Sequence, residues 1–214
     1  MKQPTSTGAG QILSGILLIA GALVITGSCA SSALAAPTTC PRFEIGKRVT
    51  GTMVDSLKCH ETFVSELFKA GNEGLKDGIT NCKQVAMEPP DQQHWELVEE
   101  EGTSTQQYAE VSLGPSIQIL PAFSNTILAS SAYYAKKFDQ VAVLHLTQAA
   151  QDTQEGARDW ERAKSHLATA GSLLKGHSCT AAEDVEKLVK KEYDKGSKSL
   201  TKANLKLLAV AGGK

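Results

Sequence analysis

Apolar side chains recur at intervals of three and four residues through most of the chain after residue 51. This spacing places them on one face of an α-helix, whereas a half-buried strand requires strict alternation of apolar and polar residues. No alternating run in the sequence lasts long enough to build a sheet. Amphipathic helices joined by short loops bury their apolar faces against one another, so the sequence predicts an all-α antiparallel bundle of four or more helices.

Glycine and proline divide the first half of this pattern. A helix is predicted from Thr52 to Lys69, and the glycines that follow predict a bend or a second helix. Pro89 and Pro90 end this element, because proline has no amide hydrogen and clashes with the preceding helical turn. Beyond them, the sequence predicts a short helix over Asp91–Glu101 and a polar loop over Gly102–Pro115.

The most apolar segment after the leader, Ile117–Ala150, predicts the central core helix. A further helix is predicted over Asp152–Lys175. The last helix is predicted to begin at Thr180, because Glu183 three residues later completes a capping box. The buried stripe predicted for the central helix comprises Ile127, Leu128, Ala132, Ala135, Phe138, Val141, Ala142 and His145. The buried side predicted for the helix after it comprises Trp160, Ala163, Leu167, Ala170 and Leu174.

The N-terminus has the features of a cleavable export signal. Its apolar block, Ile12–Ile25, would span about 21 Å as a helix, short of a hydrocarbon core of roughly 30 Å. The small residues after this block predict signal-peptidase cleavage after Ala35 or Ala36. The mature protein is then a single bundle domain over residues 36–214, secreted to the periplasm, cell wall or apoplast.

Two other interpretations of the leader stay open. The stretch between Lys2 and Arg42 contains no charged residue, so it is long enough to anchor the chain in a membrane if it remains uncut. Alternatively Cys29 carries a lipid, although Thr26 matches the residue usual at such sites poorly. Contact with a membrane is expected only in these two cases.

Cleavage of the leader leaves four cysteines, which predict two disulfides in an exported domain. Of the three pairings open to them, pairing in chain order is favoured: Cys40 with Cys59, and Cys82 with Cys179. Aromatic residues make up only 5% of the chain, so the core rests on small aliphatic side chains and benefits from such cross-links. No C-x-x-C sequence is present, which disfavours zinc, redox and haem-attachment sites.

No motif in the sequence identifies an enzyme. The formal net charge of -1 disfavours a nucleic-acid partner, for which a strongly basic surface is expected. The sequence contains no nucleophile elbow, phosphate-binding glycine loop or metal-ligand spacing of histidines. We therefore predict a non-enzymatic protein with no catalytic residues, metal or cofactor.

One basic stripe is a candidate contact for an acidic protein partner. Lys198, Lys202 and Lys206 stand four residues apart, on the face opposite the apolar positions of the last predicted helix. The same lysines also complement the negative end of the helix dipole, and solvation is the commoner role of such a stripe.

The C-terminal part of the chain resembles the plant invertase and pectin methylesterase inhibitor family. The resemblance lies in Trp160, the stretch 166–170, Cys179, and the stretch 199–204 before the apolar run 205–210. It implies an exported four-helix bundle with two disulfides that inhibits a carbohydrate-active enzyme by covering its cleft. The family's third cysteine has no counterpart here, so Cys82 would have to replace it. The alternative expectation is an exported binding or structural module that holds an apolar ligand or is tethered to the cell envelope.

Overall fold

Long amphipathic helices account for nearly all the residues that the computed structural model describes, which are 40–41, 48–87 and 92–212. All assigned elements in this part of the chain are helical, so the predicted all-α fold is confirmed. The leader, its cleavage site and Cys29 lie outside the described residues. The elements are α1 (Gly51–Val85), α2 (Gln92–Tyr108), the π-helical turn η1 (Ala109–Leu113), α3 (Gly114–Ile117), α4 (Leu120–Ala135), α5 (Gln140–Lys175) and α6 (Cys179–Gly212).

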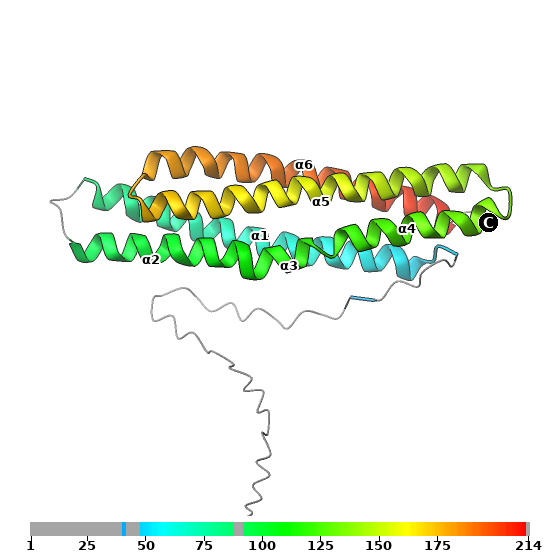
Figure 1. Cartoon of the computed structure of the whole chain (residues 1–214), viewed down its shortest axis with the longest axis horizontal. Coiled ribbons are helices and arrows are strands. Elements are labelled where there is room, and N and C mark those ends of the chain that lie inside the picture. Colours follow the sequence, from blue (N-terminus) through cyan, green and yellow to red (C-terminus); the bar gives the residue numbers. More distant parts are fainter. Residues whose placement is uncertain (1–39, 42–47, 88–91, 213–214) are drawn as a thin grey trace, which may run out of the picture. The chain divides into compact units, whose positions relative to one another are not determined.

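The helices form an up-down-up-down bundle in which α2, η1, α3 and α4 together make one irregular arm beside α1 (Figure 1). Helix α1 and the arm run antiparallel, as two hydrogen bonds across their seam show. The Tyr108 hydroxyl donates to the Leu67 carbonyl at 3.0 Å, and the Asn81 amide donates to the Glu101 carboxylate at 2.6 Å. Around the bundle, α1 packs on the arm and on α6, while α5 packs on the arm and on α6.

Helix α1 is continuous through the glycines at which a bend was predicted, so that prediction was wrong. The glycines serve packing instead. A Cβ atom on Gly71 would lie 3.0 Å from Leu167 Cδ2, and one on Gly78 would lie 2.8 Å from Leu174 Cδ1. Glycine costs helix stability in isolation, but here the missing side chains let α1 approach α5 closely.

The polar loop predicted over Gly102–Pro115 was also wrong, because α2 continues to Tyr108 and η1 follows directly. Gly102 does not end the helix but brings α2 against α5. A Cβ atom there would lie 2.6 Å from the carbonyl oxygen of Gly171. Among the polar residues of this stretch, Ser104, Gln107 and Glu110 are exposed, whereas Thr105 is buried.

The predicted central helix Ile117–Ala150 is divided by a turn at Phe138, and this is the largest error of the sequence-based assignment. Asp139 begins a new helix, since its carboxylate accepts a hydrogen bond from the Ala142 amide at 3.0 Å. Ile127 and Ala142 of the predicted core stripe are buried. The exposed members of that stripe are Leu128, Ala132, Ala135, Phe138 and Val141.

The buried side predicted within Asp152–Lys175 is confirmed, although this segment is the later part of α5 rather than a separate helix. The capping box predicted at Thr180 does not form. Helix α6 begins at Cys179, and Glu183 makes an ion pair with Lys83 of α1 at 2.8 Å instead. The competing partner on the neighbouring helix is a tertiary feature that local sequence does not reveal.

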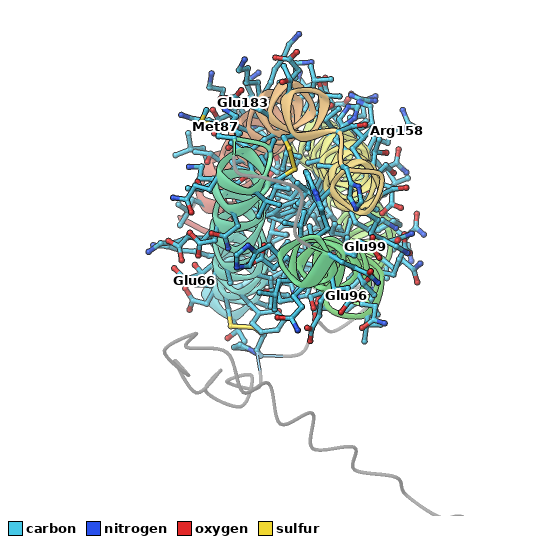
Figure 2. All side chains as sticks on the ribbon, turned by 90° about the vertical axis from the view of Figure 1, so that its left-hand side faces the viewer. Glu66, Met87, Glu96, Glu99, Arg158 and Glu183 are labelled. Carbon is cyan, nitrogen blue, oxygen red and sulfur yellow. A yellow bond between two sulfur atoms is a disulfide. The ribbon has the colours of Figure 1, made fainter. Side chains whose placement is uncertain are left out.

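Both disulfides favoured from the sequence are present. Cys82–Cys179 joins the end of α1 to the start of α6, and Cys40–Cys59 ties the chain before α1 to that helix. The view along the bundle shows the helices around a filled interior, with Glu66, Glu96 and other charged side chains pointing outward (Figure 2). Small and aliphatic residues dominate this interior.

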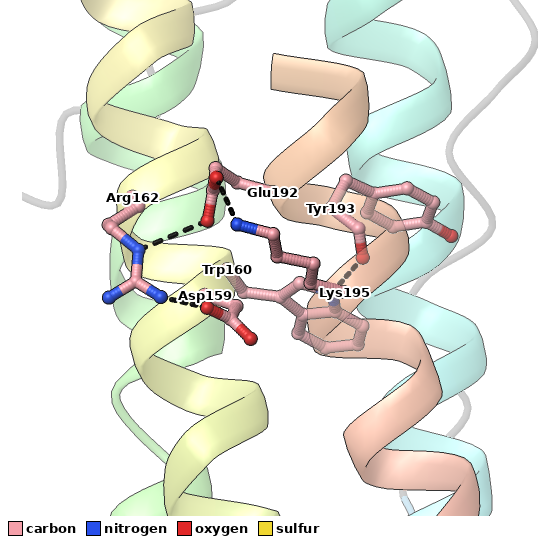
Figure 3. Close-up of polar contacts among 6 residues, drawn as sticks. All are labelled: Asp159, Trp160, Arg162, Glu192, Tyr193 and Lys195. Atoms are coloured by element: carbon pink, nitrogen blue, oxygen red, sulfur yellow. Dashed lines mark hydrogen bonds and ion pairs between the residues drawn. The ribbon is translucent and has the colours of Figure 1, made fainter. Parts of the chain in front are cut away.

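The α5–α6 seam combines close backbone approach with charged bonds at its edge (Figure 3). The Trp160 indole is fully buried over Gly196 and donates to the Tyr193 carbonyl at 3.2 Å. Beside it, Glu192 accepts from Arg162 at 3.1 Å and from Lys195 at 2.7 Å. The hydrogen bond from Lys195 is the main reason why the pKa of Glu192 lies below its ordinary value.

Candidate functional site: a groove between α1 and α6

A groove of about 380 Å³ lies between the first half of α1 and the last half of α6. The two helices run antiparallel along the groove, so successive turns of each helix contribute side chains to its lining. The groove has a polar floor and apolar walls. Its lining residues are Val54, Lys58, Glu61, Thr62, Ser65, Thr201, Asn204, Leu205 and Leu208.

Glu61 is the half-buried carboxylate of this groove. One of its oxygens accepts a hydrogen bond from the Asn204 amide nitrogen at 2.8 Å, and the other accepts from the Thr201 hydroxyl at 3.5 Å. Burial raises the pKa of Glu61 above its ordinary value and outweighs these two bonds and the field of Lys58, which lower it. The charged form of Glu61 is therefore incompletely solvated in the folded protein.

Asn204 lies beneath the groove and is only 8% exposed. Its amide nitrogen faces Glu61, because an ionised carboxylate only accepts hydrogen bonds. The amide oxygen of Asn204 is then left buried with no hydrogen-bond partner among the described residues. A buried polar atom without a partner costs about 1–3 kcal/mol. Both polar groups of the floor thus lack part of the solvation that water would give them.

The walls of the groove expose apolar surface. Leu205 and Leu208 of α6 are 61% and 51% exposed, while Val54 of α1, also in the lining, is buried. Leucines on the outer face of a helix gain nothing from packing within the bundle. Together with the carboxylate of Glu61 and the other polar side chains of the lining, they form a concave surface that combines apolar contacts with a charged anchor, as small-ligand sites commonly do.

Comparison with models of protein families, with curated proteins and with solved structures found no match.

The basic stripe predicted from the sequence does not act as one unit. Lys206 bonds to Asp152 of α5 across the seam. Lys198 and Lys202 are exposed, and within the described ranges neither makes an ion pair. Contact of the three lysines with a partner stays a prediction. All three lie outside the groove lining, although Thr201 and Asn204 of the same helix are part of it.

Sequence reasoning missed both Glu61 and Asn204. Neither belongs to a recognisable motif, and they are 143 residues apart in the chain. Glu61 follows Cys59 and His60, a pair whose adjacency has no catalytic geometry. Cys59 is in a disulfide, and buried His60 bonds through its Nε2 to the Ser116 carbonyl at 2.7 Å. Burial lowers the pKa of His60, which favours its neutral form.

The described residues form neither a metal-binding cluster nor a membrane-spanning helix. No group of three or more His, Cys, Asp or Glu side chains in this part of the chain is arranged to hold a metal ion. Among the same residues, no helix combines the length and apolar character needed to cross a membrane.

Proposed function

We propose that the protein is an exported, non-enzymatic binding protein that holds a small amphiphilic cation in the α1–α6 groove. The observation that carries this proposal is the half-buried carboxylate of Glu61 beside the exposed side chains of Leu205 and Leu208. The ligand would bring an ammonium group to Glu61 and lay a short aliphatic portion on the two leucines.

A cation suits this site because of the energetic state of Glu61. Folding removes water from the carboxylate without providing a positive partner that compensates fully, so the pKa of Glu61 is raised. A bound ammonium group would supply that partner. An anionic ligand would instead add repulsion. Lys58 lies on the rim of the groove, so its charge opposes the ligand and its removal should strengthen binding.

The two disulfides support export, because such bonds persist in oxidising compartments. Cys82–Cys179 also joins α1 to the start of α6, and Cys40–Cys59 ties the lead-in to α1 two residues before Glu61. A groove whose walls are held before the ligand arrives requires less ordering when it binds.

Glu61→Gln is expected to abolish the preference of the groove for a cation. The probes are n-hexylammonium, 1-hexanol and hexanoate, titrated by calorimetry or by amide chemical shifts. Wild type should bind hexylammonium about tenfold or more tightly than hexanol, because a hydrogen bond to a charged group contributes about 1.5–3 kcal/mol. In Glu61→Gln hexylammonium should bind no more tightly than hexanol, because Lys58 remains and repels a cation, and Lys58→Met should bind hexylammonium more tightly.

The matched control is Glu183→Gln, which removes a carboxylate paired with Lys83 near the opposite end of α6 and should leave all three affinities unchanged. Equal affinity of wild type for hexylammonium and hexanol would contradict the proposal. The pH dependence gives a second check: affinity should rise with pH through the folded pKa of Glu61, since only the ionised carboxylate attracts the probe.

Glu61→Gln should also stabilise the ligand-free protein, so a loss of binding in this variant cannot be attributed to a damaged fold. Between the ordinary pKa of 4.5 and the raised value, the folded chain keeps a proton on Glu61 that the unfolded chain has lost. The contribution of Glu61 to wild-type stability therefore falls as pH rises through this range. The stability of Glu61→Gln minus that of wild type should become more positive over the same range in urea unfolding from about pH 4 to about pH 8. Contributions from His60 and Glu192 cancel in this difference.

Inhibition of an invertase or a pectin methylesterase is the second candidate function. The all-helical bundle with two disulfides is the architecture that the family resemblance implies, and this favours it. Purified protein added to either enzyme should then abolish activity at a near-equimolar ratio. Reversing the charge of Lys198 and Lys202 should weaken inhibition if the basic stripe contacts the target. Full activity of both enzymes at acidic and neutral pH would contradict this candidate.

A further inference from the structure

The turn between α4 and α5, at one end of the bundle (right-hand side of Figure 1), has an unusual central residue. Phe138 has a φ of 59°, in the left-handed region, and its side chain is 87% exposed. Glycine or asparagine normally occupies such a position after a helix, because a bulky side chain there is strained. Phe138 is thus unfavourable twice, in its backbone conformation and in its exposure to water, and packing within the bundle explains neither.

Further apolar side chains follow the turn. Val141 is 66% exposed and Leu144 is 56% exposed, three residues apart on the first turns of α5. Residues spaced in this way share one face of a helix. Their spacing is typical of a core-facing helix, yet nothing in the described part of the chain covers them. This is the segment whose sequence predicted burial.

The charge around the turn is positive. Lys136 and Lys137 immediately precede Phe138 and are exposed, and the Lys137 ammonium lies 4.5 Å from the centre of the Tyr133 ring. The single acid of the turn, Asp139, accepts the hydrogen bond from the Ala142 amide that caps α5. Its negative charge is therefore directed at the helix N-terminus, while the two lysines remain available to an anionic surface.

We propose that this apolar tip, defined as Phe138, Val141 and Leu144 with Lys136 and Lys137, inserts into the surface of a membrane containing anionic lipid. An exposed aromatic and aliphatic cluster flanked by lysines matches an interface where acyl chains lie beneath anionic headgroups. A second copy of the chain fits less well, since a two-fold contact through the tip would bring the same lysines together. The contact is peripheral, and it goes beyond the ligand site proposed for the groove.

The test is co-sedimentation of the mature protein, residues 36–214, with phosphatidylcholine vesicles, with and without phosphatidylserine, because the apolar leader would itself bind both kinds of vesicle. All variants share the same N-terminus, so differences between them report the tip. Phe138→Gly should weaken binding to phosphatidylserine vesicles about tenfold, because it removes the largest apolar side chain. Lys136→Glu with Lys137→Glu should weaken it by roughly 30-fold or more, and phosphatidylcholine alone should bind poorly.

Met87→Gly is the matched control, because Met87 is 86% exposed near the opposite end of the bundle and its loss should not change binding. Phe138→Gly should also raise the thermal midpoint, since glycine relieves the left-handed strain, so lost binding cannot be attributed to unfolding. Binding of Phe138→Gly equal to wild type would overturn the proposal. So would a wild-type dimer in sedimentation velocity that Phe138→Gly converts to monomer, because the tip would then be an interface between copies.

Discussion

Replacing Cys82 and Cys179 by alanine is expected to lower the free energy of unfolding by about 4–5 kcal/mol. The reason is the length of chain that this disulfide closes, 97 residues, because a longer closed loop restricts the unfolded ensemble more. Cys82 is also fully buried at the end of α1, so the substitution removes packing at the junction with α6. Urea unfolding monitored by circular dichroism measures the loss directly.

The disulfide between Cys40 and Cys59 provides the comparison. It closes only 19 residues, and the same entropic estimate gives about 3 kcal/mol. The double alanine variant at these positions should therefore be less destabilised than the variant at Cys82 and Cys179. The reverse order would mean that the lead-in to α1 stabilises the folded bundle by more than its loop entropy, and would contradict the prediction.

Gly196→Ala is expected to destabilise the protein by about 1–3 kcal/mol, although alanine favours a helix more than glycine does. The added Cβ atom would lie 2.3 Å from Trp160 Cδ1 and 2.9 Å from the Gly156 carbonyl oxygen. Trp160 cannot simply swing aside, because its ring is fully buried and its nitrogen donates to the Tyr193 carbonyl. Relief therefore requires α5 and α6 to separate along their seam.

Gly74→Ala is the matched control within a long helix. No atom lies within 4 Å of the added Cβ atom, so the substitution should stabilise the protein by about 0.5–1 kcal/mol through the lower backbone entropy of the unfolded chain. The two alanine variants should thus shift the thermal midpoint in opposite directions. A stabilising Gly196→Ala would show that the α5–α6 seam tolerates wider spacing than the structure indicates.

The sequence predicted features that depend on residues close together in the chain, and it failed where contacts between distant residues decide the structure. The buried side around Trp160 was predictable because helical periodicity is a local property of consecutive residues. The glycines were misleading because their low helix propensity is also a local property, whereas their effect in this protein depends on tertiary contacts. At Gly102, local propensity favours a break, but contact of the backbone with Gly171 favours a continuous helix, and the tertiary contact prevails.

The candidate site was beyond prediction from the sequence. Glu61 and Asn204 meet only because α1 and α6 pack antiparallel, and neither residue lies in a motif. The sequence predicted the composition of the apolar tip but not its exposure. The apolar character of Phe138 and Val141 is plain in the sequence, but a repeating apolar pattern carries no information on whether another element covers it.

Local periodicity by itself determined that this chain forms helices and that those helices form a bundle, whereas its four cysteines left three pairings open until the structure showed which one forms. Helix formation is predictable in this way because it depends on interactions between near neighbours in the chain. Only the tertiary structure decided where helices end, which apolar residues stay exposed, and that Glu61 loses water beside Asn204. These features depend on which helix faces touch, because burial and desolvation are set by the distances between elements far apart in the chain.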